Sequence, residues 1–86
     1  MTRYVSAERL DKDDFGVPFT HAQGEVVYDA KTRLGPWATM TATSFHRHTS
    51  GSLGVGLGQK YVRDEHGQLW LTSGGKADGV NQGGYK

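Results

Sequence analysis

The residues that could carry chemistry are spread along the chain rather than grouped. Serine, histidine and aspartate are all present, but no sharp turn presents a nucleophile, and neither a paired carboxylate site nor an activated nucleophile is evident. We therefore predict that the protein is not an enzyme, and that its function depends on what it binds.

The metal-ligating residues are sparse as well. The chain has four histidines and no cysteine, which excludes disulfides and thiolate metal sites. His46 and His48 lie two residues apart in a predicted helix, where roughly 3.6 residues per turn direct them to different sides. Helical chelating pairs are spaced three or four residues apart, and a tight zinc site needs three or four converging ligands. We expect no metal and no other cofactor.

A glycine-rich loop could cradle a phosphate. Its glycines are Gly51, Gly54, Gly56 and Gly58, but the spacing of a P-loop is absent. A dinucleotide fingerprint would follow a strand and precede a helix, whereas the predicted order here is helix, loop, strand. We interpret the glycines as positions where the backbone passes close to the neighbouring hairpin.

Basic residues gather in the middle of the chain, close to aromatic ones. Residues 25–63 hold five Lys and Arg against two acidic residues, a net charge of +3. Such a segment could meet an acidic protein surface or stack nucleobases, although its charge is far below that of a dedicated nucleic-acid domain. Trp37 could belong to the core or to such a surface. The candidate partner-binding residues are Lys31, Arg33, Trp37, Arg47, Lys60 and Arg63.

Two hairpins and one helix are predicted to position these residues. Residues 25–41 form the first hairpin, in which Gly35 supplies a positive φ and Ala38 and Met40 share one face of the second strand. Residues 41–49 follow as a helix of about two turns, capped by a hydroxyl residue, with Phe45 turned inward and Gly51 ending it. Residues 59–63 and 68–72 form the second hairpin.

The two ends of the chain carry weaker signals. Tyr4 and Val5 could form an edge strand, and Ser6 could cap one helical turn whose acidic end frays. Residues 1–73 are predicted to form one small domain, followed by a disordered glycine-rich tail at 74–86. No long apolar run or secretory leader is present, which favours the cytoplasm. The expected fold is α+β and rich in β-structure, with two hairpins around one short helix.

Three landmarks resemble a family of small phage and prophage proteins, which are generally of unknown function. They are Tyr28-Asp-Ala-Lys-Thr-Arg-Leu-Gly-Pro-Trp-Ala-Thr-Met40, Phe45, and Gly56-Leu-Gly-Gln-Lys-Tyr61. The resemblance covers residues 18–72. It implies a treble-clef-like arrangement of knuckle, hairpin and helix.

Many members of that family carry two cysteine pairs, one before the first hairpin and one at the start of the helix, similar to a zinc knuckle. The equivalent places here are Thr20 and Gln23, and Thr41 and Ser44. The resemblance therefore implies a treble-clef-like domain without zinc, held together by packing.

The function that follows is binding. We expect a phage accessory protein that binds a host protein in the bacterial cytoplasm and modulates or inhibits it, for example a host enzyme or a defence system. The alternative is a small nucleic-acid-binding module that uses the basic hairpin 25–41. No membrane partner is expected.

Overall fold

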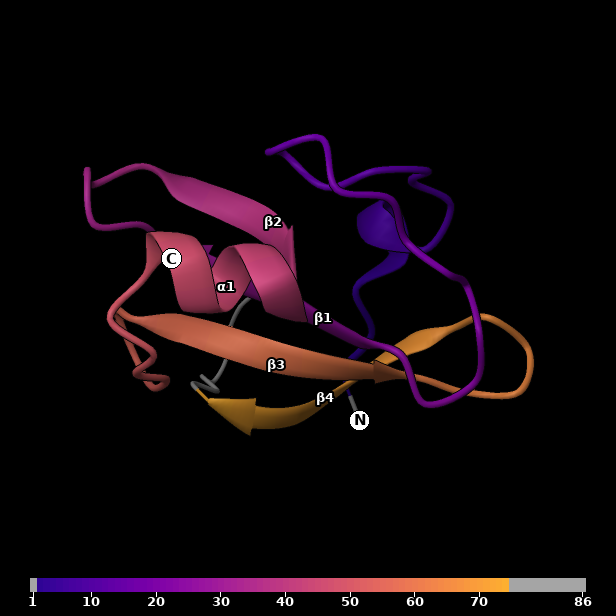
Figure 1. Ribbon diagram of the computed structural model, residues 1–86. Coiled ribbons are helices and arrows are strands. Elements are labelled where there is room, and N and C mark those ends of the chain that lie inside the picture. Colours follow the sequence, from indigo (N-terminus) through magenta and orange to yellow (C-terminus); the bar gives the residue numbers. More distant parts are fainter. Residues whose placement is uncertain (1, 75–86) are drawn as a thin grey trace.

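The structure is a computed structural model in which residues 2–74 are described (Figure 1). It is an α+β fold rich in β-structure, as the sequence predicted. The elements are, in order, the 3₁₀ helix η1 (Val5–Ala7), β1 (Val26–Lys31), β2 (Trp37–Thr41), α1 (Ala42–His48), β3 (Gly58–Arg63) and β4 (Leu69–Gly74).

One antiparallel sheet contains all four strands, in the order β2-β1-β3-β4. Both predicted hairpins are confirmed, and they join because β1 also pairs with β3, which the sequence did not predict. β4 extends to Gly74, one residue into the predicted tail. Residues 75–86, where the rest of that tail was predicted, lie outside the described residues.

Helix α1 covers one face of β1 and β2. Tyr28 and Ala30 of β1 lie opposite Met40 and Ala38 of β2, and all four are buried together with Phe45. The Phe45 ring stacks on the Tyr28 ring with centroids 3.8 Å apart. The predicted pairing of Ala38 with Met40 on one face, and of Phe45 with the core, is confirmed.

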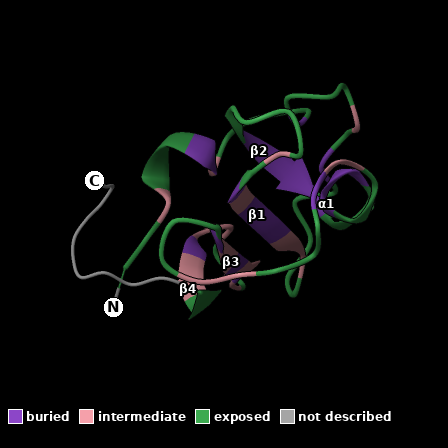
Figure 2. Ribbon diagram, turned by 90° about the vertical axis from the view of Figure 1, so that its left-hand side faces the viewer, coloured by how far each residue is buried: buried purple, intermediate pink, exposed green. Residues whose placement is uncertain are grey.

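The N-terminal segment, residues 2–25, covers the other face. Ala7 and Phe19 from this segment pack against Val27, Tyr61 and Leu69 of the sheet. Figure 2 shows buried parts of β1 and β2 lying between α1 on one side and the N-terminal segment on the other. The sheet is therefore a middle layer, which explains why Thr39 and Thr41 are buried on the face opposite Ala38.

The N-terminal segment also covers both outer edges of the sheet. Next to β4, the backbone nitrogen of Tyr4 donates to the Leu69 carbonyl, and that of Leu71 donates to the Thr2 carbonyl. Next to β2, the backbone nitrogen of Asp14 donates to the Thr39 carbonyl at 3.0 Å. Tyr4 thus lies along the edge of the sheet as predicted, whereas Val5, the other residue of the predicted edge strand, belongs to η1.

Two predictions for this segment are wrong. Ser6 lies inside η1 instead of capping it, because the N-cap position is Tyr4. The acidic end does not fray, because Asp13 is buried and its carboxylate accepts hydrogen bonds from the backbone nitrogens of Phe15, Val17 and Thr41. Burial alone would raise the pKa of Asp13, but the hydrogen bonds to its carboxylate outweigh burial and lower that pKa to about 2.

Polar side chains hold the loop before β1 and the start of α1. The Glu25 carboxylate accepts hydrogen bonds from the backbone nitrogens of Thr20 and His21, at 2.6 and 2.9 Å, and so closes the loop before β1. Thr41 caps α1 by accepting from the backbone nitrogen of Ser44, and its hydroxyl donates to Asp13. Hydrogen bonds to two carboxylates thus fix both segments.

The end of α1 differs from the prediction. The helix ends at His48 with Thr49 as its C-cap, and the Thr49 hydroxyl donates to the Phe45 carbonyl at 2.7 Å. Gly51, with a φ of +85°, lies two residues beyond that cap and does not end the helix. No helix within residues 2–74 has the length and apolar character to cross a membrane.

Candidate functional site

Two loops meet at one end of the sheet. The turn between β1 and β2 and the loop between α1 and β3 both lie at the left in Figure 1. They are joined by hydrogen bonds from the backbone nitrogen of Lys31 to the Leu57 carbonyl and from that of Arg33 to the His48 carbonyl, each 2.9 Å long. We call this surface, residues 31–37 and 53–57, the loop end.

Local sequence explains the shape of both loops. In the turn, the Thr32 backbone nitrogen and hydroxyl both donate to the Pro36 carbonyl, and Gly35 takes the predicted positive φ of +111°. In the second loop, a Cβ on Gly58 would lie 2.5 Å from the Ala30 Cβ. The interpretation as a point of close backbone approach is therefore confirmed for Gly58. It is wrong for Gly51, Gly54 and Gly56, where a Cβ would meet nothing within 4 Å and a positive φ accounts for the glycine.

The loop end exposes large apolar side chains. Leu34 is 94% exposed and Val55 is 83% exposed, and Trp37 and Leu57 are each 43% exposed. Three other large apolar side chains within residues 2–74 are also exposed, namely Val5, Leu10 and Phe15. Of these, Phe15 lies beside the loop end. Large apolar side chains exposed at one end of a small domain are typical of a surface that another molecule covers.

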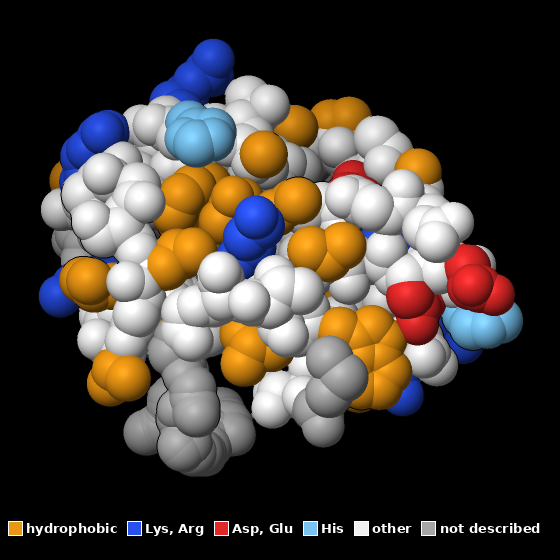
Figure 3. All heavy atoms as spheres, turned by 90° about the horizontal axis from the view of Figure 1, so that it is seen from below, with side chains coloured by type: hydrophobic (Ala, Val, Ile, Leu, Met, Phe, Trp, Pro, Cys, Tyr) orange, Lys and Arg blue, Asp and Glu red, His pale blue; other side chains and the backbone are white. Residues whose placement is uncertain are grey.

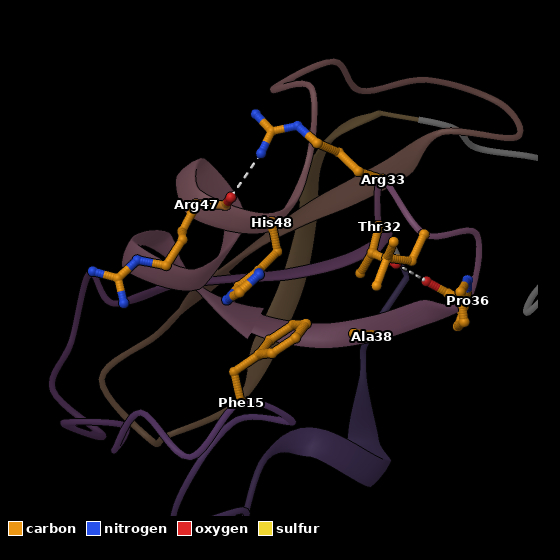
Figure 4. A pocket seen from close by; sticks show the side chains of 8 residues that line it. Phe15, Thr32, Arg33, Pro36, Ala38, Arg47 and His48 are labelled. Atoms are coloured by element: carbon orange, nitrogen blue, oxygen red, sulfur yellow. Dashed lines mark hydrogen bonds between the residues drawn. The ribbon is translucent and has the colours of Figure 1, made fainter.

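A groove lies on the α1 side of the loop end (Figure 4). It has a volume of about 410 Å³. The Phe15 ring stacks on the His48 imidazole with centroids 3.8 Å apart and planes 9° apart. The Arg33 guanidinium donates to the Arg47 carbonyl at 2.7 Å. The groove is lined by Phe15, Thr32, Arg33, Leu34, Pro36, Ala38, Arg47 and His48.

The charged side chains that line this groove, Arg33 and Arg47, are both positive. None of its lining residues is acidic, and the sequence contains no Asp or Glu between Asp29 and Asp64. In the view from below, the visible acidic side chains lie in the right half, away from the loop end at the left (Figure 3). Part of this charge has a structural role, because Arg33 binds the C-terminal carbonyls of α1, where a helix dipole favours cations.

The structure divides the six predicted partner-binding residues among several places. Arg33 and Arg47 come together at the groove. Lys31 and Trp37 lie opposite each other where β1 and β2 meet the turn that joins them. Because side chains alternate along a strand, Lys31 and Trp37 lie on the sheet face opposite Ala38 and the groove.

The other two predicted residues, Lys60 and Arg63, belong to neither of these two pairs. Lys60 lies on β3 between Tyr28 and Ser73 of the neighbouring strands, and is partly buried. Arg63 is buried, with its Nε atom 3.0 Å from Glu25 and its Nη1 atom donating to the Glu8 and Gly67 carbonyls at 2.9 Å each. The prediction that Arg63 contacts a partner is wrong, because the side chain fastens the N-terminal segment to the sheet.

Sequence reasoning missed the apolar part of the surface. Leu34 could have been found, because an aliphatic side chain in an otherwise polar turn has no core to enter. Val55 and Leu57 lie between the glycines of the second loop, and only those glycines were considered. Phe15 and His48 gave no signal, because only the tertiary fold brings the two rings together.

A partly buried carboxylate lies on the opposite face of the sheet. Burial, together with the charge of Asp14, raises the pKa of Asp29 to about 6. Burial, with the charge of Asp29, also raises the pKa values of Tyr4 and Tyr61 to about 12. Asp29 therefore changes its charge within a pH range that cells and assays reach.

The described residues also lack a possible metal site. Within residues 2–74, no group of three or more His, Asp or Glu side chains is placed to hold a metal ion.

No protein-family model matches the chain, and no curated protein or solved structure is significantly similar to it. The loop end is therefore interpreted from its own geometry.

Proposed function

We propose that the protein is a non-catalytic accessory protein that binds another protein through the loop end. The observation that carries this proposal is the exposure of Leu34, Val55, Trp37 and Leu57 at one end of the sheet, in two loops that contain Lys31 and Arg33 but no acidic residue. Covering a large aliphatic side chain contributes roughly 1.5–3 kcal/mol, and aromatic anchors such as Trp37 often dominate binding energy.

The partner we propose is a host protein in the bacterial cytoplasm, and the consequence of binding is modulation or inhibition of that protein. This part rests on the resemblance of the Tyr28–Met40 and Gly56–Tyr61 landmarks to small phage proteins. A chain of this size can block an enzyme or a defence system simply by occupying its surface, because a standard interface covers about 800 Å² of each partner.

The second candidate function is nucleic-acid binding by the hairpin of β1 and β2. Lys31 lies opposite the half-exposed Trp37, a pairing suited to a phosphate beside a stacked base. However, Arg33 and Arg47 lie on the other side of the hairpin and Arg63 is buried, so the cations do not follow one path along a strand. Protein binding is the better supported function.

The test is affinity capture from bacterial host lysate, with and without nuclease, read by mass spectrometry. The surface variant is Leu34→Asp with Val55→Asp, and the control is Val5→Asp, which alters an apolar residue that is 62% exposed outside the loop end. We expect one host protein to remain after nuclease treatment with the wild type and the control, and to be lost with the surface variant.

Two results would contradict the proposal. Retention of the same partner by the surface variant would place binding elsewhere on the molecule. Loss of every partner on nuclease treatment would favour the nucleic-acid candidate, and Lys31→Glu with Trp37→Ala would then abolish binding to a labelled oligonucleotide, with an affinity that falls steeply with salt.

A further inference from the structure

We propose that the groove beside the loop end receives an apolar side chain from an acidic segment of the partner protein. This inference rests on the proposed function and names the chemistry of the segment that is bound. The occupant is a short stretch of chain in which an aliphatic or aromatic residue is flanked by Asp or Glu.

The size and lining of the groove fit an apolar anchor. Its volume of about 410 Å³ lies at the lower end of the range for ligand sites, roughly 300–1,000 Å³. Phe15, Leu34, Pro36 and Ala38 supply apolar walls. A single large side chain and the adjoining backbone would fill a hollow of this size.

The walls are held in place before any partner arrives. The backbone nitrogen of Phe15 donates to the Asp13 carboxylate at 2.9 Å, and that carboxylate also accepts from the Thr41 hydroxyl. The Phe15 ring is then fixed by its stack on His48. Pro36 is rigid, and its carbonyl accepts from Thr32. Little side-chain freedom is lost when such a groove is filled, which favours binding.

The two arginines select for acidic neighbours of the anchor. Figure 4 shows the guanidinium groups of Arg33 and Arg47 pointing in different directions around His48. Carboxylates on both sides of an anchor residue could therefore each meet one guanidinium, in charge-assisted hydrogen bonds. No acidic residue lines the groove to compete for them.

The apolar walls argue against a nucleic acid as the occupant. Leu34 and Pro36 are aliphatic and offer no aromatic face on which a base could stack. The two aromatic rings that line the groove, Phe15 and His48, are already stacked on each other within the protein. A nucleic acid is therefore one of the alternative outcomes that the experiment must detect.

The experiment selects peptides from a random heptapeptide display library on the folded protein. Selected peptides are synthesised with a fluorescent label, and their affinities are measured by anisotropy for the wild type, Arg47→Glu, Phe15→Ala and Arg9→Glu. Arg9 is exposed outside the groove, so Arg9→Glu matches the charge change of Arg47→Glu. Thermal unfolding of each variant shows that it remains folded.

We expect selection to enrich peptides with Asp or Glu next to an aliphatic or aromatic residue. We also expect Arg47→Glu and Phe15→Ala to weaken their binding by about tenfold or more, while Arg9→Glu changes it by less than about twofold. If the Phe15→Ala variant does not fold, the wild type is used instead, and NMR measures whether adding the peptide shifts the amide resonances of Phe15 and His48.

Three outcomes would overturn this inference: no enrichment, enrichment of peptides without acidic residues, or tighter binding of a labelled single-stranded oligonucleotide than of any peptide at the same groove. These outcomes can be distinguished from failure of the proposed function. A host partner that depends on Leu34 and Val55 but not on Arg47 would retain the proposed function and overturn only the groove inference.

Discussion

The replacement Asp29→Asn is expected to stabilise the protein at neutral pH. Burial and the nearby charge of Asp14 raise the pKa of Asp29 from 3.8 to about 6. The folded protein therefore takes up a proton more readily than the unfolded chain, and the ionised carboxylate destabilises the fold. Each pKa unit corresponds to about 1.4 kcal/mol, so the cost at neutral pH has an upper limit of about 3 kcal/mol.

The sign of the pH dependence follows from the same difference. Below about pH 4 Asp29 is protonated in both the folded and the unfolded state, and it does not lower the free energy of unfolding. This destabilising effect develops as the pH rises between about 4 and 6, and it is complete above that range. Because Asp29 is in partial contact with solvent, we expect Asp29→Asn to raise the free energy of unfolding by about 1–2 kcal/mol at pH 7.5. The gain should disappear at pH 3.5.

Urea unfolding followed by tryptophan fluorescence at pH 7.5, 5.0 and 3.5 measures this difference. The control is Asp11→Asn, which alters an exposed aspartate in the N-terminal segment. Two results would refute the reasoning: Asp29→Asn less stable than the wild type at pH 7.5, or a difference between the two that is the same at pH 7.5 and 3.5.

Two further substitutions test the polar contacts that fasten the N-terminal segment. Arg63→Met leaves the Glu25 carboxylate without its buried cation, so we expect a loss of about 3 kcal/mol or more in urea unfolding; a loss below about 1 kcal/mol would contradict this account. Asp13→Asn removes a carboxylate with a pKa of about 2, whose stabilising effect is complete above about pH 4 and lost as the pH falls through 2. We expect a loss of about 2 kcal/mol at pH 7 that shrinks toward pH 2 in circular-dichroism melts, and a loss that does not change with pH would contradict the assignment.

Local sequence signals predicted the regular elements well. Alternation in residues 37–41, the glycine at 35 and the hydroxyl cap at Thr41 are features of a few neighbouring residues, and the structure contains all of them. The joining of the two hairpins was not predicted, because the pairing of β1 with β3 depends on residues about thirty positions apart.

The N-terminal segment shows most clearly what the sequence alone could not predict. Its residues follow neither a helical nor a strand period, and they bind the sheet through backbone groups and the carboxylates of Asp13 and Asp14. Nothing in the local sequence distinguishes such aspartates from solvated ones.

The candidate site was predicted only in part. Arg33 and Arg47 were identified as basic residues, but their meeting at the end of α1 depends on the tertiary fold. Arg63 could have been assigned correctly, because it follows Tyr61 at the two-residue spacing that keeps side chains on one buried face. Charge alone does not separate an exposed arginine from a buried one such as Arg63.

The covering of both sheet edges by the N-terminal segment has a consequence for how the chain folds. Residues 2–4 are synthesised well before Leu69 and Leu71, the residues with which they form hydrogen bonds. Residues 2–4 therefore cannot pair with β4 until residue 71 has been made. Contacts so distant in sequence slow folding, and until they form, both outer strands offer unpaired backbone groups to other chains.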